Sequence, residues 1–177
     1  MVLKPQDVVV VLKLLHYHGK RPPFSQIALE LAMSPSEVHA AVKRAQAARL
    51  LHGSALGGRP ILQALEEFLV HGVKYAFPPQ RGGLSRGMPT SYAASPLNTQ
   101  IAPGSEPPPV WPDADGPVRG LALEPLYHTV PVAAKRDPAL YELLALVDAI
   151  RDGRARERKI AVKELAKRLR ARKHADS

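Results

Sequence analysis

The segment Ser34-Pro35-Ser36-Glu37-Val38 constrains the fold more than any other part of the chain. In a capping box, the Ser34 hydroxyl accepts the Glu37 N–H, and the Glu37 carboxylate accepts the Ser34 N–H. Pro35 then falls at the first helical position, where its missing N–H costs nothing. Apolar residues follow at helical spacing, at Val38, Ala41, Val42 and Ala45. We therefore predict a helix from Pro35 to about Leu50 with one buried face.

Two further helices are predicted before Ser34. Pro5 suits a first helical turn, and the apolar run from Val8 to Leu15 continues without a turn signal until Gly19. The four consecutive valines leave a strand open as the alternative. Ser25 is a candidate cap for a second helix from Gln26 to Met33.

The stretch FSQIALELAMSPSEVHAAVKRAQAARLL, from Phe24 to Leu51, resembles the winged helix-turn-helix of MarR-type bacterial transcriptional regulators. The matching positions are Leu31-Ala32, Ser34 and Val38, which in such proteins hold two helices at a fixed angle. The resemblance covers the N-terminal third of the chain. It implies a DNA-binding regulator that acts as a homodimer, reads the major groove with the helix at 35–50, and uses the glycine-rich segment Leu51–Pro60 as its wing.

The residue types on the polar face of this helix suit that role. A helix that enters the major groove needs small or hydrogen-bonding residues near its N-terminus and cations nearby for phosphates. A helix N-terminus such as that of the second helix also favours a phosphate. The predicted DNA-binding residues are Ser25, Gln26, Ser34, Ser36, His39, Ala40, Lys43, Arg44 and Arg59. An ordinary solvated face, or a unit that docks another protein, is the alternative interpretation.

Charge and proline divide the chain into three regions. The net charge is +9 with a pI of about 10.0, which favours a nucleic acid or another polyanion as partner. Residues 1–60 have a net charge of +5, residues 61–150 of −3 and residues 151–177 of +7. Thirteen of the 18 prolines lie between Pro78 and Pro138. We therefore expect a DNA-binding domain at 1–75, a proline-rich extended arm at 76–137 and a basic helical region at 138–177, in a mainly α protein.

The middle region begins with an amphipathic helix, predicted from Ile61 to Tyr75. From Pro78 to Pro117 the sequence is rich in turn residues, so an ordered arm and a disordered linker are the two interpretations. An arm would pack through its large side chains, Tyr92, Leu97, Ile101, Val110 and Trp111. Short strands or extended contacts are expected between Val118 and Val132.

The C-terminal region predicts two helices. Asp137 is the cap and Pro138 the first residue of a helix that ends at Gly153, and a second helix runs from about Arg156 to Arg172. Four basic residues at the start of this second helix are candidates for polyanion binding: Arg154, Arg156, Arg158 and Lys159. The apolar faces of the helices at 61–75 and 138–151 are candidates for the homodimer interface.

No pattern in the sequence points to catalysis. The chain has no cysteine, and no HExxH, phosphate-loop, GxSxG or GxGxxG motif occurs in it. We expect a protein without enzymatic activity, metal or cofactor that is cytoplasmic and does not contact the membrane. Double-stranded DNA is the expected partner. The alternative function is an antitoxin or adaptor whose proline-rich arm wraps a partner protein, such as a toxin.

Overall fold

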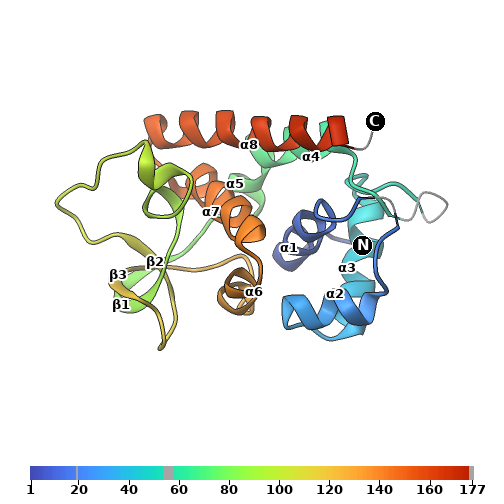
Figure 1. Ribbon diagram of the computed structural model, residues 1–177, viewed down its shortest axis with the longest axis horizontal. Helices are drawn as coiled ribbons and strands as arrows, with labels where there is room; N and C mark the ends of the chain where they lie inside the picture. Colours follow the sequence, from blue (N-terminus) through green and yellow to red (C-terminus); the bar gives the residue numbers. More distant parts are fainter. Residues whose placement is uncertain (19, 54–57, 176–177) are drawn as a thin grey trace.

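The computed structural model describes residues 1–18, 20–53 and 58–175. The protein is mainly helical with one small sheet (Figure 1). Its N-terminal part contains α1 (Pro5–Leu14), α2 (Phe24–Leu31) and α3 (Pro35–Ala47). The predicted capping box of α3 is confirmed, with Ser34 as its cap and Pro35 as its first residue.

Two predicted helix ends were wrong. The helix α1 stops at Leu14 rather than near Gly19, which lies outside the described residues. The helix α2 begins at Phe24, so Ser25 lies inside its first turn and does not cap it. Pro23 occupies the cap position instead, with the extended backbone that proline favours.

The valine-rich segment is helical because it is buried on every side. All residues from Val8 to Leu12 are at most 1% exposed. The helix α1 packs against α3 on one side and against the C-terminal helix α7 (Pro138–Asp152) on another. A helix that is apolar all round belongs in a core, and this position settles the helix-or-strand alternative.

The predicted helix at 61–75 is confirmed in extent but is not regular. It consists of α4 (Leu62–Glu67), a π-helical segment (Phe68–Gly72) and α5 (Val73–Ala76). Leu65, Leu69 and Val73 lie on its buried face.

The proline-rich region forms a three-stranded closed sheet, most of which the sequence did not predict. The strand β1 (Arg81–Pro89) pairs antiparallel with β2 (Pro109–Pro112) and with β3 (Val118–Leu123), and β2 and β3 pair in parallel. Only the strand at 118–123 falls where short strands were expected. Two glycines allow the close approach of backbones: a Cβ at Gly87 would lie 2.1 Å from the Trp111 carbonyl oxygen, and one at Gly120 would lie 2.0 Å from that of Pro108.

The C-terminal part contains α6 (Val130–Arg136), α7 and α8 (Ala155–Ala175). Asp137 caps α7 as predicted, and α7 ends at Gly153. Every residue from Leu143 to Arg151 in α7 is buried within the chain. Figure 1 shows α8 along the top edge of the molecule, where it packs on α7 and α4.

The burial of α7 overturns one expectation. Its apolar face and that of the helix at 61–75 were the two candidates for the homodimer interface, but the apolar residues of both faces are buried in the core of this chain. Every helix within the described ranges is too short or too polar to cross a lipid bilayer.

A polar network joins the sheet to α7. One carboxylate oxygen of Asp148 accepts hydrogen bonds from Thr90 Oγ1 and Trp111 Nε1, both at 2.7 Å. The other oxygen contacts Arg151 Nη1 at 2.8 Å, and Arg151 Nε donates to the Phe77 carbonyl at 2.9 Å. Burial raises the pKa of the Asp148 carboxyl, while its three partners satisfy both carboxylate oxygens, which the core would otherwise leave unpaired.

Candidate nucleic-acid interface

The outward face of α3 carries exposed polar and basic residues. Val38, Ala41, Val42 and Ala45 point into the core. The opposite side of the helix exposes Ser36, His39 and Lys43, with Ala40 half-buried between them. These residues recur every three or four positions, so they form one line along the helix. The structure therefore brings together four of the predicted DNA-binding residues, and Ser34 is exposed at the helix cap, with its hydroxyl oxygen 3.0 Å from that of Ser36.

The start of α2 lies next to this line. Ser25 and Gln26 are exposed in the first turn of α2, and Gln26 donates to Glu30 at 3.2 Å. The Phe24 ring packs against the His39 ring at 5.6 Å between centroids. The Arg21 guanidinium stacks on the same Phe24 ring, 4.2 Å from its centre. Sequence reasoning missed this group because the predicted helix began at Gln26, which left Arg21 and Phe24 outside it, although Phe24 lies at helical spacing from Ile27 and Leu31.

Arg44 does not belong to the exposed surface. Its guanidinium donates two hydrogen bonds to Asp7, from Nε at 2.8 Å and from Nη2 at 2.7 Å. The Arg44 side chain is only 14% exposed and that of Asp7 is fully buried. Hydrogen bonding to Asp7 raises the pKa of Arg44. This arginine fixes α3 against α1, and its predicted role as a DNA contact is not supported by its geometry.

A short antiparallel connection follows α3. Leu51 and Pro60 form a β-bridge, and the His52 N–H donates to the Arg59 carbonyl at 2.8 Å. Gln46 on α3 donates to the His52 carbonyl at 3.1 Å, which fastens the base of this hairpin to the helix. Arg59 is exposed at that base. The predicted wing runs from Leu51 to Pro60, and its tip at 54–57 lies outside the described residues.

The N-terminus of α3 is also held from the C-terminal half of the chain. Glu37 accepts the Ser34 N–H at 2.7 Å with one carboxylate oxygen, and its other oxygen accepts a short hydrogen bond from the Tyr127 hydroxyl. These hydrogen bonds, with Ser34 first, lower the pKa of Glu37, and the same carboxylate raises the pKa of Tyr127. Because Tyr127 lies 90 residues from Glu37 in sequence, no local pattern could have revealed the contact.

The four basic residues predicted at the start of α8 divide into two groups. Arg158 points inward and donates to the Ile150 and Gly153 carbonyls at 3.3 and 3.1 Å, so it stabilises the end of α7. Arg154 is exposed and pairs with Glu106 at 3.5 Å. Arg156 and Lys159 are exposed without an acidic partner in the described part of the chain.

The proline-rich region packs on its own chain. Leu97, Val110 and Trp111 are at most 1% exposed, and Tyr92 and Ile101 are half-buried. These side chains are wholly or partly buried against the chain itself, so they offer little apolar surface to the partner protein of the antitoxin or adaptor hypothesis.

A cavity of about 420 Å³ lies between this region and the start of α8. Four of its charged lining residues form two ion pairs, with Arg81 2.9 Å from Asp152 and Arg154 3.5 Å from Glu106. No histidine is among the lining residues described, and the described ranges contain no group of three or more acidic or histidine side chains that could hold a metal ion.

Comparison of the chain with protein-family models, curated proteins and solved structures finds no match. The resemblance to MarR-type regulators thus depends on the sequence pattern of residues 24–51 alone.

Proposed function

We propose that residues 5–60 form a winged helix-turn-helix that binds double-stranded DNA, with α3 as the helix that enters the major groove. The chain would act as a transcriptional regulator in this interpretation. The observation that carries the proposal is the uncovered line of Ser36, His39 and Lys43 on α3, beside the hairpin that presents Arg59.

The contacts that fix the elements of this unit on one another support the proposal. Ala32 adopts a left-handed backbone conformation (φ 54°), which turns the chain sharply between α2 and α3. The Asp7–Arg44 ion pair holds α3 on α1, and Gln46 holds the hairpin on α3. A helix that reads base pairs must be held within a fraction of an ångström of its position. The ion pair and the hydrogen bond that fix α3 and the hairpin suit this requirement.

The surface chemistry supports it as well. Serine and histidine side chains can donate to and accept from base edges, whereas Lys43, Arg59 and the Arg21 stack supply positive charge for phosphates. The one carboxylate at the start of α3, that of Glu37, is occupied by Ser34 and Tyr127.

A homodimer remains part of the proposal, because paired half-sites give a small reading helix useful specificity. The partner copy would have to contact a surface other than α7, whose apolar residues are buried in the chain.

The test is selection of DNA sequences from a random duplex library by the wild-type protein. We expect enrichment of a defined sequence, and a Ser36→Ala/His39→Ala/Lys43→Gln variant should bind that sequence at least about tenfold more weakly, since base contacts contribute roughly 1–3 kcal/mol each. Arg44 is left unchanged because its loss would disturb the fold. The matched control, Lys74→Gln on α5, should select the same sequence as the wild type. Failure of the wild type to enrich any sequence would refute the proposal.

A further inference from the structure

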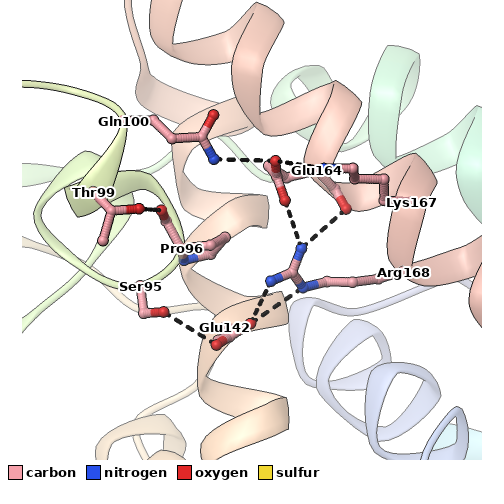
Figure 2. Close-up of polar contacts among 8 residues, drawn as sticks. All are labelled: Ser95, Pro96, Thr99, Gln100, Glu142, Glu164, Lys167 and Arg168. Atoms are coloured by element: carbon pink, nitrogen blue, oxygen red, sulfur yellow. Dashed lines mark hydrogen bonds and ion pairs between the residues drawn. The ribbon is translucent and has the colours of Figure 1, made fainter.

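One face of the helix α8 packs against the rest of the protein. Ala161, Leu165 and Leu169 are buried on it. On the same side Arg168 bridges two helices, because it contacts Glu142 on α7 and Glu164 on α8 (Figure 2). Gln100 donates to Glu164 at 3.0 Å and Ser95 Oγ to Glu142 at 3.1 Å, so the segment after β1 is tied to the same pair of carboxylates.

The opposite face of α8 carries a line of exposed cations. We call it the α8 stripe, and its members are Arg156, Lys159, Lys163, Lys167 and Arg170. Their spacings of three and four residues place all five within an arc of about 80° on a helix with 3.6 residues per turn. At a rise of about 1.5 Å per residue, the stripe extends over roughly 21 Å.

The cations of α8 differ in their contacts. Arg158 and Arg168 point inward, where Arg158 donates hydrogen bonds to backbone carbonyls and Arg168 to carboxylates. Of the five stripe residues, only Lys167 has an acidic partner in the described ranges: Glu164 lies 3.5 Å away, and the Lys167 side chain is 65% exposed. The stripe therefore presents a concentrated positive charge that the fold itself does not neutralise.

We propose that the α8 stripe is a second nucleic-acid surface, which binds the phosphate backbone of duplex DNA without reading its sequence. A duplex carries about one negative charge per 1.7 Å of its axis, so a straight row of five cations over this length can displace several condensed counterions at once. Lysine and arginine chains on one rigid helix suit phosphates, which require charge but little shape.

The other classes of anionic partner fit the surface less well. The exposed large apolar residues of the protein are Met1, Val2, Leu29, Tyr75, Leu84, Leu121 and Val132 among those described, and none belongs to α8. A membrane-binding helix needs apolar side chains to bury in the bilayer. A protein interface needs apolar or aromatic anchors at its centre, where lysine is depleted. The stripe provides neither.

This surface is separate from α3, and the inference does not require α3 to read a sequence. The two surfaces also predict different behaviour. Loss of a base-reading residue weakens binding to one sequence, whereas loss of a phosphate contact weakens binding to all sequences and reduces its dependence on salt.

The experiment measures binding of the full-length protein to a fluorescent duplex of arbitrary sequence over a series of NaCl concentrations. The variant Lys159→Gln/Lys163→Gln/Lys167→Gln keeps good helix formers at each position. The control Lys4→Gln/Lys74→Gln/Arg119→Gln removes the same charge from α5, β3 and the start of α1. We expect the stripe variant to bind roughly tenfold or more weakly at moderate salt, and its plot of log affinity against log salt to be shallower by about 2.7, at 0.9 per phosphate contact. The control should stay within about threefold of the wild type.

Equal loss of affinity in both variants would overturn the proposal, because net charge alone would then explain it. Tighter binding to polyglutamate or to phosphatidylserine vesicles than to the duplex, lost in the stripe variant, would also overturn it. Circular dichroism checks that both variants are folded. If the wild type selects no sequence but the stripe variant still loses affinity for arbitrary DNA, the proposed function fails and this inference stands.

Discussion

Arg44 and Asp7 form a two-pronged ion pair between α3 and α1, with the carboxylate of Asp7 fully buried. Removal of either partner leaves the other charge in a site from which water is excluded, which costs about 3–5 kcal/mol. We therefore expect Arg44→Met to lower the free energy of unfolding by about 3 kcal/mol, as measured by urea denaturation. The double variant Asp7→Leu/Arg44→Met should recover most of that loss. Unchanged stability in Arg44→Met alone would show that the pair does not hold the helices.

The buried carboxylate of Asp148 provides a second test. Asp148→Asn would turn an amide donor toward a neighbouring donor, either Arg151 or the Thr90 and Trp111 pair, and we expect a loss of about 3 kcal/mol in the free energy of unfolding. Trp111 is the only tryptophan and is 1% exposed, so its fluorescence reports directly on this region. The control on the same helix, Glu142→Gln, removes a partly exposed ion pair and should cost within about 1 kcal/mol. Equal costs for the two variants would argue against the importance of the buried network.

Stability should decrease in acid. Burial acts to raise the pKa of Asp137, but hydrogen bonds from Lys13 and the Leu140 N–H and the nearby charges outweigh it, so the pKa falls below its ordinary value of 3.8. Burial is likewise outweighed at Glu30, chiefly by hydrogen bonds from Tyr17 and Gln26, and its pKa lies below 4.5. A carboxylate with a lowered pKa in the folded state stabilises the fold above its unfolded pKa, and this stability is lost as the pH falls through the folded pKa.

Urea denaturation at a series of pH values from 7 to about 3 measures this effect. We expect the free energy of unfolding to be nearly constant near neutral pH and to decrease below about 4.5. Lys13→Met removes a cation that lowers both pKa values, so its pH dependence should be shallower in the acid range. Identical slopes for this variant and the wild type would exclude the Lys13 network as the cause.

The close approach of backbones in the sheet predicts that alanine substitution destabilises the fold at one glycine, Gly120, and not at another, Gly83. Gly120→Ala would place a methyl group 2.0 Å from the Pro108 carbonyl oxygen, so β2 and β3 could not keep their pairing. We expect this variant to lose more than about 2 kcal/mol of unfolding free energy. Gly83→Ala, with no atom within 4 Å of the added methyl, should change stability by about 0.5 kcal/mol or less. Both are measured by thermal or urea unfolding, and a tolerated Gly120→Ala would contradict the observed register.

The sequence predicted the start of a helix correctly where one capping side chain determines it. Ser34 and Asp137 were found because a cap acts on the amide three residues away, and proline follows each of them. The buried stripe of α3 was found because its periodicity is regular.

The features that sequence reasoning missed have distant causes. The strand β1 has mostly exposed residues and three glycines, so it shows no alternation of apolar and polar positions. The helix α6 begins with Val130-Pro131, which gave no periodic signal over its seven residues. Arg44 looked like one more cation on a polar face, because its partner Asp7 lies 37 residues earlier. The Tyr127 contact to Glu37 depends on the packing of both halves.

The burial of α1 between α3 and α7 has a consequence for how the chain can be divided. Part of the surface that covers α1 belongs to α7, more than a hundred positions away in the sequence, so we expect that the first 60 residues do not fold alone. A fragment cut after the hairpin would expose the valine face of α1 to water and leave Lys13 without Asp137. The α3 surface therefore depends on the C-terminal helices, because α7 covers the helix α1 on which α3 packs.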